Sequence, residues 1–149
     1  MIPATNLYKN SKVKPPHSRA EVEILLEKFG VKKFGWKRDV PENSFLMFQK
    51  TEDFSGKDQE ITYKVSIPFI EKPQGKYKEA VYDETRSYRI MFHVLKHLLL
   101  NTDVGMSFEQ AFGNYIVVGQ LPNKDPQNVQ ESIGEAVMGG KLPALPMLS

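Results

Sequence analysis

The hydrophobic positions of this chain change period along its length, from helical to alternating and back to helical. Near the N-terminus, apolar residues recur at the spacing of a helix face, at Val22, Leu25, Leu26 and Phe29. Ser18 and Glu21 form a capping-box pair before this face, and Gly30 follows it as a stop signal. The pattern predicts a first helix over about residues 19–29.

Three stretches of strand character follow, over residues 31–38, 44–49 and 61–67. The third alternates apolar and polar side chains, as a half-buried antiparallel strand does. Pro41-Glu-Asn43 predicts a turn between the first two strands, and a polar loop over residues 52–58 separates the second from the third. We therefore expect an antiparallel sheet.

A long, mostly apolar segment over residues 82–101 predicts a central helix packed on that sheet. Ser107 then caps a third helix, 108–115, whose aromatic face of Phe108, Phe112 and Tyr115 should dock on the central helix. A last amphipathic segment covers 129–138, and the tail 142–146 should be extended and packed against a neighbouring element.

These elements predict the α+β class, with an N-terminal helix, a three-stranded antiparallel sheet, a long central helix and short C-terminal helices. We expect an irregular basic N-terminal arm over residues 1–17 and a single domain over 18–149. Double-stranded-RNA-binding domains share this element order, and single-strand-annealing recombinases share the three-strand-then-helix core. Shared element order does not by itself assign a function.

Four basic residues lie at helical steps on the central helix and so share one face: Arg86, Arg89, His93 and Lys96. We call them the basic stripe. An arginine or lysine on such a stripe can contact the phosphates of a nucleic acid. Alternatively, Arg86 and Arg89 can pair internally with Glu109, Asp103 or Glu84, because charges on a largely buried helix need partners.

The loop before this helix combines lysines with tyrosines, at Lys72, Lys76, Tyr77, Lys78 and Tyr82. Bases stack on aromatic rings while cations hold phosphates, which is the composition that single-strand binding requires. Charge is also uneven along the chain: residues 1–50 carry ten Lys and Arg against five Asp and Glu, and residues 101–149 carry two against five. This polarity can steer a polyanion to one end, although ordinary surface charge explains it equally well.

Several function classes lack their sequence signatures. The chain has no cysteine, and it contains neither a phosphate-binding glycine loop nor a Gly-x-Ser-x-Gly elbow. His93 and His97 lie one helical turn apart, but Val94 stands where the zinc-protease pattern has glutamate. We therefore expect no catalysis, no metal and no cofactor. No signal peptide or membrane-spanning run is evident, so we expect a cytoplasmic protein.

The second half of the chain resembles a family of small uncharacterised proteins encoded by bacteriophages, prophages and mobile elements. The resemblance rests on Arg86-Ser-Tyr-Arg89 with Lys96, on the segment 105–117 and on the close 139–146, and the helix over 20–30 also fits. The chain departs from the family at Leu98, where another lysine is usual. The resemblance implies a phage origin and an α+β fold, and it implies no reaction.

Together these observations predict a non-catalytic nucleic-acid-binding protein of phage type. Arg86, Arg89 and Lys96 would contact phosphates, with support from Lys76, Lys78 and Tyr77. The alternative is a protein-binding factor, such as an inhibitor of a host enzyme or defence system, or a small assembly component. The choice between DNA and RNA, between single strand and duplex, and between monomer and homo-oligomer stays open.

Overall fold

The computed structural model describes residues 8, 11–38, 40–119 and 124–140 of the chain. Two sequence-based expectations lie wholly or largely outside these residues: the extended tail over 142–146 and most of the N-terminal arm. The described elements confirm the predicted α+β class. In chain order they are α1 (Pro15–Lys28), β1 (Lys33–Lys37), η2 (Pro41–Asn43), β2 (Phe45–Phe54), β3 (Lys57–Ser66), β4 (Glu71–Lys72), β5 (Val81–Tyr82), α2 (Glu84–Asp103), α3 (Phe108–Ala111), η3 (Gly113–Tyr115), β6 (Val117–Gly119), β7 (Gln127–Asn128) and α4 (Val129–Met138).

Helix α1 begins at Pro15, earlier than the predicted start near residue 19, and Ser18 is a buried helical residue rather than its N-cap. The two prolines occupy the first turn, where a missing N–H costs nothing and the fixed φ suits a helix. Lys14 stands at the N-cap without a side-chain hydrogen bond. Pro15 and Pro16, which fall within the irregular arm expected over residues 1–17, therefore start the helix instead.

Strands β2 and β3 form a long hairpin that runs through the predicted polar loop over 52–58. Their register continues from Phe45↔Ser66 to Phe54↔Lys57, so the turn is confined to Ser55 and Gly56. Both turn residues have positive φ, at 54° and 82°, and the Asp53 carboxylate accepts a hydrogen bond from the Gly56 N–H at 3.0 Å. Local turn chemistry thus allows polar residues to extend the ladder.

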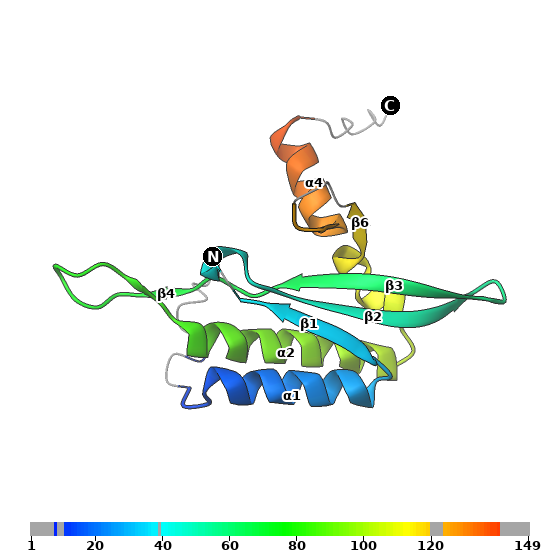
Figure 1. Ribbon diagram of the computed structural model, residues 1–149, viewed down its shortest axis with the longest axis horizontal. Helices are drawn as coiled ribbons and strands as arrows, with labels where there is room; N and C mark the ends of the chain where they lie inside the picture. The colour runs from blue at the N-terminus through cyan, green and yellow to red at the C-terminus, as the bar shows by residue number, and fades with distance from the viewer. Residues whose placement is uncertain (1–7, 9–10, 39, 120–123, 141–149) are drawn as a thin grey trace, which may run out of the picture.

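The three main strands form an antiparallel sheet in the order β1-β2-β3, and α1 and α2 cover one face of it (Figure 1). The predicted apolar stripes of both helices enter this layer, because Val22 and Leu26 of α1 and Leu95 and Leu99 of α2 are buried. The sheet contributes its inward positions to the same core, which also holds Val31, Leu46, Phe48, Tyr63, Val65, Ile67, Tyr88 and Met91.

Helix α3 seals the far end of this core with aromatic rings. Phe108 and Phe112 stack on each other with centroids 4.6 Å apart, and both meet Phe48 of β2 and Tyr63 of β3. Helix α3 does contact α2, as expected, but its rings pack mainly against rings of the sheet. The helix is also shorter than predicted, ending at Ala111, and a 3-10 turn follows over Gly113–Tyr115.

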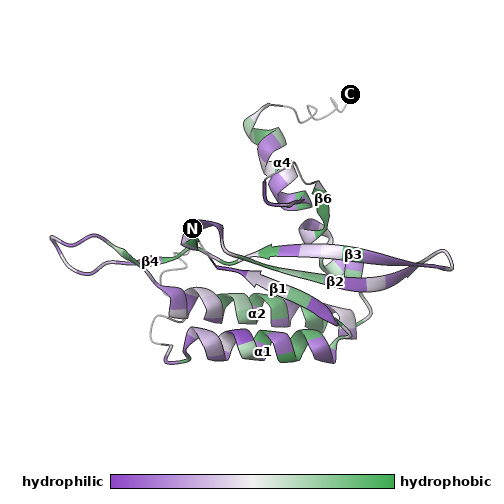
Figure 2. Ribbon diagram, viewed as in Figure 1, coloured by the Kyte–Doolittle hydropathy of each residue, from purple (hydrophilic) through white to green (hydrophobic). Residues whose placement is uncertain are grey.

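The C-terminal segment, by which we mean residues 116–119 and 124–138, lies on the opposite side of the sheet from α1 and α2 (Figure 1). Ile116 forms a bridge with Tyr63 at the edge of β3, β6 pairs with β7, and α4 stands above the sheet. Figure 2 shows that α4 carries apolar residues although it stands away from the main core. Within the described residues, no helix is long and apolar enough to cross a bilayer.

Candidate functional site

The basic stripe is divided by the packing of α2 on α1. Arg86 and Arg89 are buried, with 4% and 7% of their surface exposed, whereas Lys96 is exposed further along the helix. The two arginines therefore do not present their guanidinium groups on an open surface. This burial removes from the predicted nucleic-acid site the two residues that were expected to lead it.

Arg89 is held by a carboxylate of α1. Its Nη2 donates to Glu21 Oε2 at 2.5 Å, and its guanidinium lies over the ring of Phe92 at 4.1 Å. The hydrogen bond from Arg89 is the main reason that the pKa of Glu21 is lowered below its ordinary value of 4.5. Internal pairing of Arg89 was one of the two expectations, but the partner is Glu21 and not Glu109, Asp103 or Glu84.

Arg86 sits against the first turn of its own helix. Its Nε lies 3.8 Å from Asp83 Oδ2, while the other oxygen of Asp83 caps α2 by accepting from the Arg86 backbone N–H at 3.2 Å. Glu84, one of the expected partners, instead pairs with Arg19 of α1 at 3.6 Å. A carboxylate at this helix N-terminus is favoured by the macrodipole as well as by the cations around it. Arg89 thus belongs to the α1–α2 interface, and Arg86 is buried at the start of α2.

The remaining members of the stripe differ from the arginines. Lys96 is exposed and lies 6.0 Å from the centroid of the Phe92 ring. His93 is half-buried and stacks on Tyr8, with centroids 4.6 Å apart and the rings nearly parallel. Burial lowers the pKa of His93, and the nearby charges of Arg89 and Lys96 lower it further. A neutral imidazole in this position is a packing group rather than a phosphate ligand.

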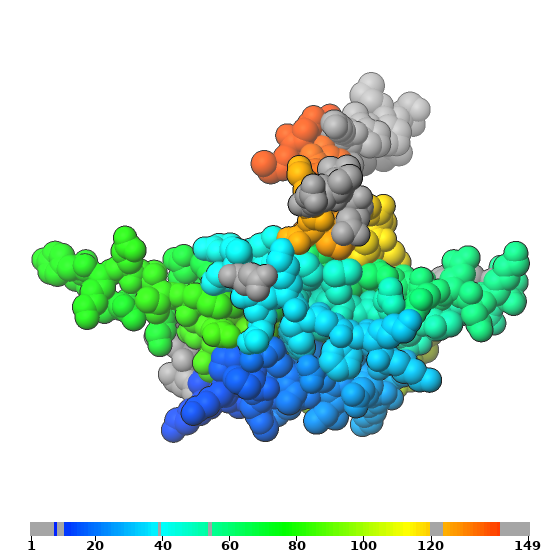
Figure 3. Space-filling view, viewed as in Figure 1, coloured from blue at the N-terminus to red at the C-terminus, as the bar shows by residue number. Residues whose placement is uncertain are grey.

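Lys76, Tyr77 and Lys78 lie together at an accessible place, a projection that we call the finger (residues 71–82). Strands β4 and β5 pair at its base, where the ring of Phe69 stacks on Tyr82 at 5.4 Å and the Asp83 N–H donates to the Ile70 carbonyl at 2.7 Å. Every residue from 71 to 80 is exposed, including the two residues of β4. Figure 3 shows the finger projecting from one end of the body.

Tyr77 is the most exposed aromatic side chain of the finger, with 91% of its surface accessible. Lys76 Nζ lies 5.8 Å from the centroid of its ring, and Lys78 follows it directly. The finger contains three lysines and two glutamates, Glu71 and Glu79, so it is polar and carries a small net positive charge. The ring is thus held out in solvent between two lysines in sequence, and it buries very little of its area in the fold.

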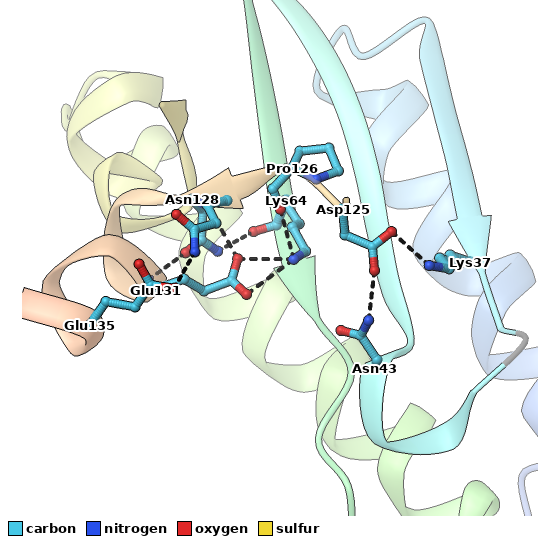
Figure 4. A network of polar contacts seen from close by, with 9 residues as sticks. Lys37, Asn43, Lys64, Asp125, Pro126, Asn128, Glu131 and Glu135 are labelled. Atoms are coloured by element: carbon cyan, nitrogen blue, oxygen red, sulfur yellow. Dashed lines mark hydrogen bonds and ion pairs between the residues drawn. The ribbon is translucent and has the colours of Figure 1, made fainter. Parts of the chain in front are cut away.

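A second polar cluster joins the C-terminal segment to the outer face of the sheet (Figure 4). Lys64 of β3 is only 2% exposed, and its ammonium donates to both oxygens of Glu131 at 3.0 and 3.1 Å and to the Pro126 carbonyl at 2.9 Å. Asn128 donates to the Lys64 carbonyl at 2.7 Å and accepts from the Glu131 N–H as the cap of α4. We call these residues, with Asp125, the Lys64 anchor.

Asp125 makes the outer attachment of this anchor. Its two oxygens accept from Lys37 Nζ of β1 and from Asn43 Nδ2, each at 2.6 Å. The hydrogen bond from Lys37 is the main cause of the lowered pKa of Asp125, and the one from Asn43 adds to it. Sequence reasoning missed the anchor, because Lys64 occupies a polar position of an alternating strand and nothing local indicates that it is covered.

The described residues offer no group of three or more His, Cys, Asp and Glu that could hold a metal ion. His93 and His97 line a shallow pocket on α2 with Tyr8 and Leu98, without a carboxylate among the lining residues. The polar clusters that do form pair lysine or arginine with carboxylate, although the buried Nε atoms of Arg86 and Arg89 find no hydrogen-bond partner.

Comparisons with known proteins leave this chain without an assigned class. No family model matches it, and no curated protein and no solved structure resembles it significantly.

Proposed function

We propose that this protein binds single-stranded nucleic acid without catalysis, through the finger. The exposure of Tyr77 between two lysines is the observation that carries the proposal. An exposed ring that packs on nothing is a stacking platform for an unpaired base, and flanking cations can hold the phosphates on either side. Lys72, at the base of the finger, is exposed as well and extends the cationic edge.

The proposal differs from the sequence-based hypothesis in its contact residues. Lys76, Tyr77 and Lys78 keep their expected roles, and Lys96 is accessible for a peripheral phosphate contact. Arg86 and Arg89 instead position the finger, because they fix the start of α2 immediately after β5. A phage origin and a cytoplasmic location remain part of the proposal, on the strength of the sequence.

The test is fluorescence anisotropy with labelled single-stranded DNA, single-stranded RNA of the same sequence, and the corresponding duplex, across salt concentrations. We expect single strands to bind more tightly than duplex. The Tyr77→Ala variant should weaken single-strand binding roughly 5- to 150-fold, the cost of about 1–3 kcal/mol for a lost stacking platform. Tyr77→Phe should bind like the wild type, because it keeps the ring.

Charge reversal at two places distinguishes the effect of a local phosphate contact on affinity from the effect of the protein's net charge. The Lys76→Glu/Lys78→Glu variant should lose affinity and reduce the salt slope by roughly 1.4, for two phosphate contacts on a single strand. A matched control, Lys28→Glu/Lys57→Glu, makes the same change in net charge at the end of α1 and the start of β3, at the opposite end of the molecule (Figure 1). Equal losses in both variants, or no binding at low salt, would refute the finger as the site.

A second candidate function, a protein-binding factor, is favoured by an apolar patch beside α3. Leu100, Val104 and Met106 are 49%, 84% and 43% exposed at the end of α2 and in the following turn. Aliphatic side chains exposed together commonly mark protein contacts. Two results together would support the protein-binding function. The finger variants would leave nucleic-acid binding unchanged, and Val104→Asp would abolish an association of the wild type, either with itself as seen by light scattering or with a host protein.

A further inference from the structure

The edge of β3 that faces away from β2 is available for hydrogen bonding at its last residue. Antiparallel strands exchange hydrogen bonds at every second residue, and the Ile67 N–H donates to the Ser44 carbonyl just beyond the β2–β3 ladder. Odd-numbered residues of β3 therefore bond to β2, and even-numbered residues point their N–H and C=O groups outward. Ser66, the last residue of β3, is exposed and points both groups to the free edge.

The C-terminal segment covers this edge only as far as Lys64. The Lys64 carbonyl accepts from Asn128, and the neighbouring Tyr63 forms a bridge with Ile116. Among the described residues, none hydrogen-bonds to the backbone N–H or C=O of Ser66. Because Pro68 has no N–H, the stretch of edge beyond Lys64 offers one complete pair of donor and acceptor. An added strand needs several such pairs for its affinity, whereas a single planar group needs only one.

A pocket of about 280 Å³ opens at this free edge. It lies where α2 on one side of the sheet and the C-terminal segment on the other leave the end of β3 uncovered (Figure 1). Buried Val65 and Met91 give it an apolar lining, and Tyr115 and Gln130 add an aromatic ring and an amide. None of the described residues that line it is charged, so it suits an uncharged ligand of small size.

These properties describe a neutral, planar ligand with a hydrogen-bond donor next to an acceptor. An unpaired nucleobase has all of them, and proteins that read such a base bond its Watson–Crick edge and pack its faces on apolar and aromatic side chains. We propose that this pocket binds one nucleobase, whose edge exchanges two hydrogen bonds with the N–H and C=O of Ser66. Pro68 lines the pocket and the finger begins at Glu71, so a strand on the finger can supply the base, and in this respect the inference rests on the proposed function.

Free nucleosides test the pocket without the finger. In a nuclear magnetic resonance titration of isotope-labelled protein, at least one of uridine, cytidine, adenosine and guanosine should shift the Ser66 amide saturably. The amide of Asp58, at an equivalent outward position of β3 in the hairpin, should not move. Tyr77→Ala should bind the same nucleoside with unchanged affinity, so a failure of the finger leaves this result intact. No saturable shift with any nucleoside, or equal binding of the strand mimic N-acetylalanine methylamide, would overturn the proposal.

A proline substitution isolates the backbone donor. Ser66→Pro removes an N–H that points away from the ladder, a place where an edge strand tolerates proline, and it should weaken nucleoside binding about tenfold. Ser66→Ala keeps the N–H and should bind like the wild type, and Asp58→Pro is the matched backbone control. Gln130→Trp is a second variant that fills the pocket from an exposed position and should also abolish binding, whereas Gln59→Trp, at an exposed position of the hairpin, should not.

Binding of a whole strand distinguishes the source of the base. If the base belongs to a strand on the finger, Ser66→Pro should weaken single-strand binding in the anisotropy assay by the same factor as nucleoside binding. If the ligand is a free nucleoside, strand affinity should be unchanged while nucleoside affinity falls, and both results support a nucleobase pocket. Equal nucleoside affinities in the wild type, Ser66→Pro and Gln130→Trp would overturn it, whatever Tyr77→Ala does to strand binding.

Discussion

At the scale of single residues, burial decides what each charged group can do. Arg89 and Lys96 lie on the same predicted stripe, yet Arg89 is paired with Glu21 in a helix interface and Lys96 is in solvent. Tyr77 and Tyr63 differ in the same way, since Tyr77 is almost fully exposed and Tyr63 is enclosed by the rings of α3. Residue type and spacing are therefore poor guides to function until the packing is known.

The Arg89–Glu21 pair leads to a prediction about stability. Glu21→Gln leaves a buried guanidinium without its carboxylate and should cost about 3 kcal/mol, the lower end of the range for a broken buried pair. Arg89→Met should cost less, because the methionine fills the space and Glu21, whose side chain is about a third exposed, can regain water. Urea denaturation gives the free energy of unfolding of both variants. A larger loss of stability in Arg89→Met than in Glu21→Gln would contradict the prediction.

The same pair predicts a dependence on pH. The pKa of Glu21 is lower in the folded protein than its ordinary value, so the pair stabilises the fold fully above that ordinary value. Its contribution is lost as the pH falls through the folded pKa. The stability difference between the wild type and Glu21→Gln should therefore narrow below about pH 4.5, which urea titrations at a series of pH values would show.

At the scale of elements, the chain combines a well-packed core with a C-terminal segment that is attached to it by polar contacts. The helices α1 and α2 bury their stripes on the sheet, whereas the C-terminal segment is joined largely through the Lys64 anchor. Polar attachment is specific in geometry but contributes less net stability than apolar burial. We expect the C-terminal segment to open before the core does.

A substitution at the Lys64 anchor tests whether the C-terminal segment opens before the core. In Lys64→Met, the side chain keeps its bulk but cannot donate to Glu131 or to the Pro126 carbonyl. Hydrogen exchange followed by mass spectrometry should show faster exchange over residues 124–138, with β2 and α2 protected as in the wild type. The control Lys33→Met removes an exposed lysine that pairs with Glu60, and it should change neither region. Uniform loss of protection in Lys64→Met would mean that the anchor belongs to the core.

At the scale of the whole molecule, three projections leave a common body: the finger at one end, the β2–β3 hairpin at the other and α4 above the sheet (Figures 1 and 3). Each exposes side chains that the core does not use. The body fixes the base of the finger through Ile70, Phe69 and Tyr82, so the finger's tip is presented at a defined place. Such separation of the scaffold from the proposed contact surface should allow each to be altered alone.

Removal of the finger's tip tests whether the fold is stable without the proposed contact residues. Replacing residues 73–80 by Asn-Gly, a turn that suits a two-residue hairpin, should change the free energy of unfolding by only about 0.5 kcal/mol, because no buried side chain is lost. Nucleic-acid binding should fall to the level of the Lys76→Glu/Lys78→Glu variant. Thermal unfolding and anisotropy measured on the same preparation check both parts, and a large loss of stability would show that the tip supports the fold.

The sequence by itself determined the class and order of elements, because periodicity records which side of each element is apolar. The stripe of α1, the alternation of β3 and the bounds Val129–Met138 of α4 follow from local pattern alone. Its errors were at element ends, where Pro15 starts a helix and Asp53 supports a tight turn, and in the short strand pairs β4–β5 and β6–β7, which the pattern did not predict. These outcomes depend on packing and turn chemistry that compete with simple propensity.

Only the tertiary structure decided which charged side chains are buried in ion pairs and which are exposed to solvent. Glu21 is 68 residues from Arg89 and Glu131 is 67 residues from Lys64, so no local spacing connects either pair. Which residues of α4 meet the body is likewise a matter of docking, and Glu131 of α4 pairs with Lys64 of β3. Burial of a charge depends on elements brought together by the fold, and that is why the candidate contacts moved from the buried arginines to the finger.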